Sequence, residues 1–448
     1  MFERSKGGEK ALLVLPRLTG PGRAGRDEEA AQEFAELARS AGATVVAEVP
    51  ARVERPNPST LVGSGKLEEI QALCEASGAD LVLVDHALSP VQERNLERAL
   101  KRRVVDRRGL ILDIFALRAR SNEGKLQVEL AQLQHLATRL VRGWTHLERQ
   151  RGGAIGLRGP GEKQLELDRR MLQAKVEQLQ KRLRKVEVQR GQQRRARLRN
   201  AVPRVALVGY TNAGKSTLFN RLTGSGVYAA DQLFATLDPT VRRVDGLACG
   251  PLVLADTVGF VRDLPHELVA AFRSTLAEAR DADLLLHVVD AADPERLERI
   301  AQVDAVLEEI GAGDLPQLLV FNKIDLVEGL APRRDRDVAD GESGGRERVW
   351  LSAMKEQGLD LLREALSGRF ADRQLRLQLD LPLSAGRLRA RLHELGGILS
   401  EQSGETGWSM VVELPRDVFE QLAAGSGGEP VRSALLAAAG PASYNEES

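Results

Sequence analysis

The sequence is poor in cysteine and in aromatic residues. Its 448 residues include only two cysteines, Cys74 and Cys249, and their separation fits no metal-ligand spacing. This excludes a disulfide framework and a cysteine-based zinc site, and it favours a reducing, intracellular compartment. Because only 4% of the residues are aromatic, the hydrophobic cores must consist mainly of Leu, Val, Ala and Ile.

Long hydrophobic runs and an excess of one charge are also absent. The apolar run Ala11–Leu15 is too short for the core of a signal peptide, and no stretch approaches the length of a membrane span. Lys+Arg and Asp+Glu each number 64, so only the distribution of charge can point to a partner. We expect a cytoplasmic monomer without stable membrane insertion.

In residues 1–120, short apolar runs alternate with segments of amphipathic helical spacing. Strands separated by helices are typical of a parallel sheet, so a small parallel α/β domain is predicted. The predicted strands are Ala11–Leu15, Thr44–Val49, Leu81–Asp85 and Arg103–Asp106. The predicted helices are Asp27–Ser40, Lys66–Ala76 and Pro90–Leu100.

Residues 121–200 have the pattern of an antiparallel helical hairpin with a coiled-coil seam. Between the two predicted helices, the loop Arg149–Gly161 contains five glycines and three arginines and is predicted to be non-helical. The apolar residues at helical spacing are Leu126, Leu130, Leu133, Leu136 and Leu140 on the first helix, and Leu165, Leu172, Val176, Leu179, Leu183 and Val186 on the second.

A second α/β alternation fills residues 201–371 and predicts a nucleotide-binding domain. Its charged, glycine-rich insert Gly329–Gly345 is predicted to be a mobile surface loop. The predicted strands are Arg204–Val208, Leu252–Asp256, Asp283–Asp290, Gln317–Asn322 and Arg348–Ser352.

Residues 372–448 are predicted to form a small α+β domain. Leu375–Leu381 and Trp408–Leu414 have the pattern of strands, and a helix is predicted near Ala385–Leu395. The tail from Gly425 has weak patterning. The predicted fold class is therefore a multidomain α/β protein with a helical hairpin between two α/β domains.

The segment Gly209–Ser216, GYTNAGKS, matches the P-loop pattern G-x-x-x-x-G-K-S. It follows an apolar strand and precedes a helix, which is the context that the motif requires. Glycines let backbone N–H groups turn toward phosphates, and the helix N-terminus adds favourable partial charge. Lys215 is predicted to reach the β- and γ-phosphates, and Ser216 to ligate Mg²⁺.

The segment Asn322–Asp325, NKID, ends a later strand and predicts a guanine pocket. A carboxylate at Asp325 can accept hydrogen bonds from N1 and the 2-amino group of guanine, a donor pair that adenine lacks. Lys323 is expected to pack along the base, and Asn322 to tie the loops together. Ser352–Met354 ends the next strand and offers a backbone N–H to the guanine O6.

Two segments between these motifs, Phe234–Asp238 and Asp256–Gly259, predict the nucleotide switches. Asp256 is expected to hold the Mg²⁺ shell and the Gly259 N–H to sense the γ-phosphate. Thr236 is the expected switch threonine that closes on Mg²⁺, and Thr240 is the alternative. The predicted catalytic residues are Lys215, Thr236 and Gly259, and the predicted metal ligands are Ser216, Thr236 and Asp256. The predicted nucleotide-binding residues are Gly209, Tyr210, Thr211, Asn212, Ala213, Gly214, Lys215, Ser216, Phe234, Ala235, Thr236, Leu237, Asp238, Asp256, Thr257, Val258, Gly259, Asn322, Lys323, Ile324, Asp325, Ser352, Ala353 and Met354.

The residue after Gly259 is Phe260, which has no hydrogen-bonding group to orient the attacking water. Intrinsic hydrolysis is therefore expected to be slow. A macromolecular partner could order the switches, or a K⁺ ion beside Asn212 could stabilise the developing charge. Asn212 could instead only shape the loop through hydrogen bonds to its own backbone.

Four segments carry a resemblance to a known family. One is the switch segment Phe234–Thr240 (FATLDPT). The other three are Asn57–Lys66 (NPSTLVGSGK), Arg107–Phe115 (RRGLILDIF) and Gly152–Arg170 (GGAIGLRGPGEKQLELDRR). The stretch from about residue 10 to 370 resembles the HflX family of translational GTPases. The resemblance implies an N-terminal α/β domain, a helical hairpin, a G domain and a variable C-terminal domain. It also implies binding to the large ribosomal subunit and its RNA, and dissociation of stalled or idle ribosomes.

The charge distribution favours an RNA partner independently of the resemblance. Residues 139–199 contain 18 Lys and Arg against 6 Asp and Glu, a combination suited to phosphate-lined cavities. Arg149, Arg151 and Arg158 in the loop are the candidate RNA contacts, although a basic coiled coil can also simply be a solvated surface. A GTPase subunit of an RNA-modifying system is the alternative function, but residues 1–120 contain no Cys/His or paired-carboxylate cluster to carry its chemistry.

Overall fold

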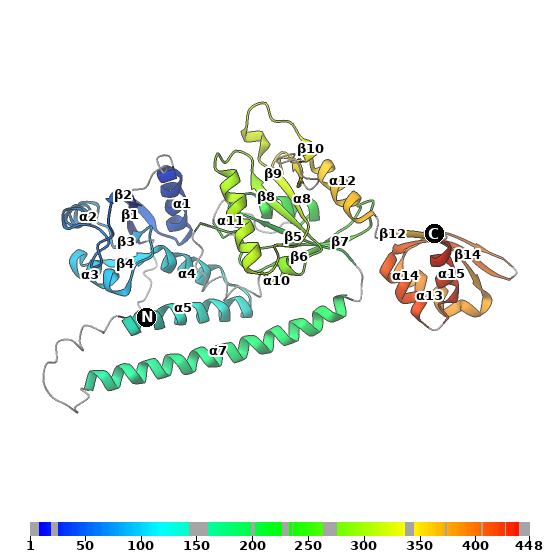
Figure 1. Cartoon of the computed structure of the whole chain (residues 1–448), viewed down its shortest axis with the longest axis horizontal. Coiled ribbons are helices and arrows are strands. Elements are labelled where there is room, and N and C mark those ends of the chain that lie inside the picture. Colours follow the sequence, from blue (N-terminus) through cyan, green and yellow to red (C-terminus); the bar gives the residue numbers. More distant parts are fainter. Residues whose placement is uncertain are drawn as a thin grey trace, which may run out of the picture.

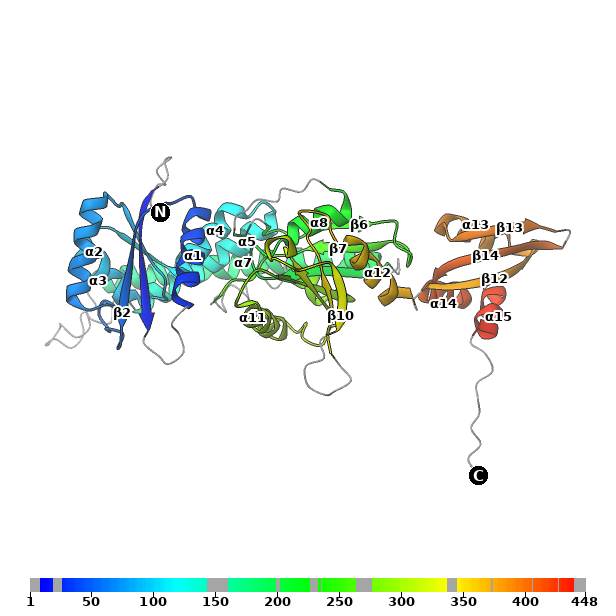
Figure 2. The ribbon, with the colours of Figure 1, turned by 90° about the horizontal axis from the view of Figure 1, so that it is seen from above.

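The computed structural model describes residues 9–18, 26–142, 160–198, 202–225, 233–234, 236–262, 276–336, 345–371, 374–404, 406–425 and 427–438. Figure 2 shows the N-terminal, G and C-terminal domains following one another along the long axis of the molecule. None of the helices in these ranges is long and apolar enough to span a membrane.

The N-terminal domain is a parallel sheet in the order β2-β1-β3-β4, covered by helices on both faces (Figure 1). Successive side chains of a strand point to opposite faces, and in β1 and β3 both faces are buried, which explains why these two strands contain continuous apolar runs. Leu13 packs with α1 and α4, whereas Leu12 packs with α2 and α3. The elements are β1 (Lys10–Leu18), α1 (Arg26–Ser40), β2 (Thr44–Val53), α2 (Ser64–Ser77), β3 (Leu81–Val84), α3 (Pro90–Leu100), β4 (Arg103–Asp106) and α4 (Arg107–Arg118).

The helical pair consists of α5 (Asn122–Arg142) and α7 (Pro160–Leu198), which lie side by side in Figure 1. Their seam buries Leu130 and Leu133 against Leu179 and Leu183. The predicted seam is wrong at Leu136, whose side chain is 51% exposed. Three residues after Leu133, the helix is about 60° short of a full turn, which carries Leu136 off the seam.

The predicted loop between these helices extends too far toward the second helix. Pro160 and Gly161 belong to the first turn of α7, where proline is tolerated because the first helical N–H groups have no intrahelical partner. The rest of the loop, including Arg149, Arg151 and Arg158, lies outside the described residues.

The G domain contains a seven-stranded sheet in the order β10-β11-β9-β8-β5-β7-β6, in which the edge strands β10 and β6 pair antiparallel with their neighbours and the other pairs are parallel. Helices α8 and α12 cover one face, and α10 and α11 cover the other. The elements are β5 (Arg204–Gly209), α8 (Lys215–Thr223), β6 (Thr240–Val244), β7 (Leu252–Asp256), α10 (Ala277–Arg280), β8 (Leu284–Asp290), α11 (Arg296–Glu309), β9 (Gln317–Asn322), η1 (Ile324–Leu326), β10 (Arg333–Arg336), β11 (Glu347–Trp350) and α12 (Leu359–Phe370).

The expectation of a surface loop over Gly329–Gly345 is wrong for Arg333–Arg336, which form strand β10. Oppositely charged side chains pair between β10 and its neighbour β11. Asp335 of β10, for example, forms an ion pair with Arg348 of β11 at 2.7 Å. The guanidinium of Arg333 also lies over the ring of Trp350. Cross-strand pairs of this kind stabilise a sheet edge despite its high charge.

The C-terminal domain is a three-stranded antiparallel sheet in the order β12-β14-β13, with helices packed against it. The weakly patterned tail contains helix α15, whose Val431 is fully buried in the domain core. The elements are β12 (Gln374–Pro382), η3 (Leu383–Ala385), α13 (Gly386–Leu395), β13 (Ile398–Ser403), β14 (Gly407–Pro415), α14 (Arg416–Ala424) and α15 (Glu429–Ala438). The predicted multidomain α/β fold class is confirmed.

One hydrophobic core is shared between the N-terminal and G domains. Phe234, from the G domain, packs edge-on against Phe115 of α4, with ring centroids 4.6 Å apart. The other G-domain side chains in this core are Leu233, Leu237, Val258 and Val261. Since burying a large apolar side chain stabilises by about 1.5–3 kcal/mol, both predicted switch segments are anchored to the N-terminal domain.

Candidate functional site

The P-loop connects β5 to α8 at the carboxyl end of the sheet. Gly214 has a φ of 89°, in the left-handed region that favours glycine. A Cβ atom at this position would lie 2.2 Å from Nδ2 of Asn322, so the loop and the predicted base-binding segment approach too closely for a side chain. This close approach fixes the P-loop against the predicted base pocket.

Lys215 begins α8 and is buried beneath the P-loop. Its ammonium donates hydrogen bonds to the carbonyl oxygens of Gly209, at 3.0 Å, and Tyr210, at 2.7 Å. Burial lowers the pKa of Lys215 to about 8, although the carboxylate of Asp256 opposes the shift. A Cβ atom at Gly259 would lie 2.9 Å from the Lys215 ammonium, so this glycine borders the place where the lysine would meet a phosphate.

Three predicted metal ligands meet in one oxygen cluster, made of Ser216, Thr236 and Asp256. Oδ2 of Asp256 accepts hydrogen bonds from the Ser216 hydroxyl, at 2.7 Å, and the Thr236 hydroxyl, at 2.9 Å. The two hydroxyl oxygens are 2.9 Å apart. Burial raises the pKa of Asp256, and the hydrogen bonds from the two hydroxyls lower it in part.

The oxygen cluster fits a hard divalent cation. Within the described part of the chain, Oδ1 of Asp256 is buried and has no hydrogen-bond partner. Oxygen ligands, carboxylates among them, are what Mg²⁺ prefers in proteins. The alternative switch residue Thr240 instead begins β6, where it pairs with Asp256 through the sheet register.

Asn322 lies between the P-loop and the Ser352–Met354 segment. Its Nδ2 donates to the carbonyl oxygen of Ala213 at 3.0 Å, and its Oδ1 accepts the Ala353 N–H at 2.9 Å. Lys323 has a left-handed φ of 64° and forms an ion pair with Asp290 at 2.8 Å. This arrangement holds the surrounding loops in a fixed relation at the predicted base pocket.

The remaining base-pocket residues differ in exposure. Asp325 lies in the short helix η1 and is exposed, so its carboxylate is accessible at the predicted base pocket. The side chain of Met354 is 65% exposed, whereas Ile324 is buried in a core cluster with Phe321 and Trp350. The side chain of Ile324 is therefore not available to a nucleotide.

Several predicted nucleotide-binding side chains are engaged away from the oxygen cluster. Phe234, Leu237 and Val258 are buried in the core shared with the N-terminal domain. The Thr257 hydroxyl donates to the carbonyl oxygen of Leu207 at 2.5 Å. Asp238 binds the residues that precede α5. Ala235 lies outside the described residues.

Phe260 is fixed beside the P-loop by its backbone. Its N–H donates to the Gly209 carbonyl at 3.1 Å, and its carbonyl accepts the Thr211 N–H at 2.7 Å. The ring is buried in a core cluster with Val208 and Leu285. The side chain at this position therefore cannot orient a water molecule.

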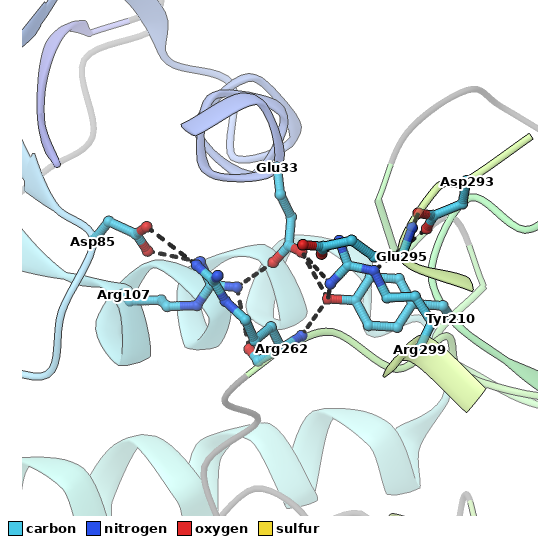
Figure 3. A network of polar contacts seen from close by, with 8 residues as sticks. All are labelled: Glu33, Asp85, Arg107, Tyr210, Arg262, Asp293, Glu295 and Arg299. Atoms are coloured by element: carbon cyan, nitrogen blue, oxygen red, sulfur yellow. Dashed lines mark hydrogen bonds and ion pairs between the residues drawn. The ribbon is translucent and has the colours of Figure 1, made fainter. Parts of the chain in front are cut away.

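A polar network joins the P-loop to the N-terminal domain, and no sequence pattern points to it (Figure 3). The Tyr210 hydroxyl donates to Glu33 of α1 at 2.6 Å and accepts the backbone N–H of Arg262 at 2.6 Å. The Arg299 guanidinium stacks over the Tyr210 ring, 4.5 Å from its centroid. Burial and the nearby Glu33 carboxylate raise the pKa of Tyr210, so the phenol remains a donor.

Arg107 of α4 completes this network on the N-terminal side. It forms ion pairs with Glu33 and, at 2.7 Å, with Asp85, and it donates to the Arg262 carbonyl at 3.1 Å. Burial alone would lower the pKa of Arg107, but the two carboxylates raise it above its ordinary value. The RRGLILDIF segment thus supplies a buried cation that contacts the G domain.

Three family models match consecutive parts of the chain. They describe the N-terminal region of a GTP-binding GTPase (residues 28–116), its middle region (residues 118–197) and a 50S ribosome-binding GTPase (residues 204–323). A solved GTP-binding protein from Sulfolobus solfataricus in complex with GDP covers 81% of this chain and 99% of its own, with 25% identity and a TM-score of 0.43.

Curated relatives match almost the whole chain. GTPase HflX from Escherichia coli (strain K12) is 56% identical over 416 residues, which cover 93% of this chain and 96% of that protein. GTPase HflX from Magnetococcus marinus is 44% identical over 428 residues, which cover 94% and 96% respectively. The chain therefore belongs to the HflX family of GTPases.

Proposed function

We propose that this GTPase uses its nucleotide state to control binding to the large ribosomal subunit, and that it dissociates stalled or idle ribosomes in the cytoplasm. The observation that carries the proposal is the oxygen cluster beside a buried P-loop lysine, in a chain with a basic helical hairpin. Such a cluster can change its contacts with the γ-phosphate, which is the property that a switch requires.

Each residue of the site has a distinct role in this proposal. Lys215 binds the β- and γ-phosphates, and the Gly259 N–H contacts the γ-phosphate. Ser216 and Thr236 hold Mg²⁺, with Asp256 orienting that shell. When bound, Mg²⁺ supplies positive charge that offsets the charge of the phosphate oxygens.

Guanine is selected by the loops that Asn322 joins. The exposed Asp325 carboxylate accepts from N1 and the 2-amino group. The expected Ala353 donor is not free for O6, because its N–H donates to Asn322. Lys323, held by Asp290, lies along the base. An adenine ring would leave these polar groups without partners, which is why such sites discriminate strongly.

Hydrolysis is slow without an activator in this proposal, because Phe260 presents no polar side-chain group. The ribosome, or K⁺ bound near Asn212, provides the missing stabilisation of the transition state. Asn212 is exposed and has a left-handed φ of 59°, so its side chain is accessible at the P-loop surface.

The hairpin supplies the ribosomal contact in this proposal. Residues 139–199 hold 18 Lys and Arg against 6 Asp and Glu, and Lys181, Arg182, Arg184 and Lys185 of α7 are all exposed. A basic helix of this kind can neutralise RNA phosphates. The match of residues 204–323 to a family described as 50S ribosome-binding GTPases supports the same partner.

Sucrose-gradient sedimentation of intact ribosomes with the protein tests this function. With GTP or a non-hydrolysable analogue, the 70S peak should decrease in favour of free subunits, whereas GDP should have little effect. Unchanged 70S peaks at physiological salt, with the protein shown to bind GTP, would contradict the proposal. RNA binding without subunit dissociation would favour a role in RNA modification.

Variants of the hairpin tip separate ribosome binding from nucleotide binding. Replacing Arg151 and Arg158 by Ala should weaken ribosome dissociation severalfold, because arginines at an RNA interface neutralise phosphates. The affinity for GTP should remain unchanged. A matched control replaces Arg363 and Arg369, two exposed arginines of α12, and should dissociate ribosomes normally.

A further inference from the structure

Asp238 lies two residues after Thr236 but binds outside the nucleotide site. Its Oδ2 accepts the backbone N–H groups of Arg120, at 2.8 Å, and Ser121, at 2.7 Å. The Ser121 hydroxyl donates to its Oδ1 and itself accepts the Gly124 N–H at 2.9 Å. One switch carboxylate therefore binds the two residues that immediately precede α5, the first helix of the hairpin.

This contact fixes the residue that caps α5. The first N–H groups of an α-helix have no intrahelical partner, and a negative charge near them is favourable. In α5 the residue immediately before the helix, Ser121, supplies this cap, because its hydroxyl accepts the Gly124 N–H. Asp238, 117 residues further along the chain, binds both the N–H and the hydroxyl of this capping serine, so the position of the cap depends on the conformation of the switch segment.

The contact is closely packed on both sides. A Cβ atom at Gly124 would lie 2.6 Å from Oδ1 of Asp238, so any side chain there would displace the carboxylate. Leu237, beside Asp238, is buried in the same core as Val128 and Ala131 of α5. A movement of this segment therefore cannot leave the start of α5 unchanged.

We propose that Asp238 is a positioning residue that holds Thr236 at the metal site by binding Ser121, the residue that caps α5, so that the start of the hairpin responds to the bound nucleotide. This inference rests on the proposed role of Thr236 in binding Mg²⁺. With GTP, the contacts of Thr236 and those of Asp238 with Ser121 support each other. After phosphate release, Thr236 loses its metal contacts, and the cap loses one of its restraints. Coupling between two sites is reciprocal, so weakening the cap must also weaken the closure of Thr236.

Hydrogen–deuterium exchange in the full-length protein measures the cap directly. The Arg120 and Ser121 amides should exchange about fivefold more slowly with a non-hydrolysable GTP analogue than with GDP. Asp238→Ala should abolish this difference. Asp245→Ala is the matched control, because Asp245 is an exposed acid that pairs with Arg243 on its own segment, and the difference should persist in it.

The kinetic signature of a positioning residue is a change in kcat with little change in KM. In Asp238→Ala, kcat should fall about fivefold while KM for GTP stays nearly unchanged, since the P-loop and base pocket are intact. Thr236→Ala serves as the reference for the underlying function. If Thr236→Ala itself hydrolyses GTP normally, the proposed role of Thr236 fails, and the inference about Asp238 fails with it.

Gly124→Ala tests the same contact from the other side and leaves Asp238 in place. Alanine favours a helix over glycine, so a purely local effect would slow exchange at the start of α5 and leave kcat unchanged. The proposed coupling predicts loss of the nucleotide-dependent protection and a lower kcat. In the native protein, the Arg120 and Ser121 amides could also exchange equally fast with the GTP analogue and with GDP. That result alone would overturn the inference.

Discussion

The Glu33 carboxylate, on the first helix of the N-terminal domain, accepts a hydrogen bond of 2.6 Å from the phenol of Tyr210 in the P-loop. The same phenol oxygen accepts the backbone N–H of Arg262, three residues after Gly259. One hydroxyl group thus joins the N-terminal domain, the P-loop and the segment that follows the predicted γ-phosphate sensor. Removing this hydroxyl group should weaken the contacts among these three segments.

Tyr210→Phe should lower the free energy of unfolding by about 1–3 kcal/mol, because Glu33 and the Arg262 N–H each lose a buried partner. In a double-mutant cycle with Glu33→Gln, the coupling energy should be about 1 kcal/mol. Urea unfolding with both single variants and the double variant measures it. Glu28→Gln removes an exposed acid from the same helix and should be additive with Tyr210→Phe. Additivity of the Glu33 pair as well would mean that this contact does not join the domains.

Binding of GTP should become linked to proton uptake above pH 8. Burial lowers the pKa of Lys215 to about 8 in the free protein, and phosphate binding requires the charged ammonium. At pH 7 and below, the lysine is largely protonated, so binding takes up almost no proton there. Above pH 8, up to the raised pKa of the complex, binding takes up one proton, and affinity falls by up to about tenfold per pH unit.

Calorimetry in two buffers of different ionisation enthalpy measures this uptake. At pH 9 the apparent binding enthalpy should depend on the buffer, and at pH 7 it should not. Lys355→Met, which replaces an exposed lysine, should behave as the native protein. A buffer dependence that is the same at both pH values would assign the proton to another group.

The elements of the nucleotide site could be predicted from the sequence because each motif is local. Gly209–Ser216 and Asn322–Asp325 each follow an apolar strand, and parallel strands bring their carboxyl ends to one edge. The same logic places Asp256 near Ser216. The three oxygen-cluster residues, predicted separately, indeed lie within hydrogen-bond distance.

The contacts between domains could not be predicted, because no periodicity records them. Glu33 is one of several acids on an amphipathic helix, and only the fold brings it to Tyr210, 177 residues away. Asp238 similarly belongs to a switch motif, yet its carboxylate binds the two residues that precede a helix of the hairpin. For Leu136 the sequence predicts a contact that the structure lacks. Its apolar side chain suggests burial in the seam, but the helix geometry leaves it exposed.

Base specificity should depend on Asp325. Asp325→Asn should shift preference from guanine toward xanthine, because the acceptor pair becomes one donor and one acceptor. The discrimination at stake is large, since a buried polar site penalises a missing partner heavily. Competition between GTP and XTP, monitored with a fluorescent nucleotide, measures the shift. If the variant ranks GTP and XTP as the native protein does, another residue reads the base.

The role of Asn212 can be resolved by exchanging the monovalent cation. If its side chain helps to bind K⁺, hydrolysis should be faster in K⁺ than in Na⁺ at equal ionic strength, and Asn212→Ala should lose the stimulation. Asn212→Gly retains the left-handed backbone, with φ at 59°, without the side-chain oxygen. Stimulation that survives in Asn212→Gly, or equal rates in both salts, would leave Asn212 as a residue that shapes the loop.

Ribosome-dependent activity is tested most sharply by the rate of GTP hydrolysis with purified ribosomal subunits. The large subunit should stimulate hydrolysis in a saturable way, because the side chain of Phe260 cannot orient the attacking water, and the small subunit alone should not. Replacing Arg151 and Arg158 by Ala should raise the concentration of large subunits needed for half-maximal stimulation, and increasing salt should do the same. A rate that is identical with and without large subunits, in a protein that binds GTP normally, would contradict the proposed function.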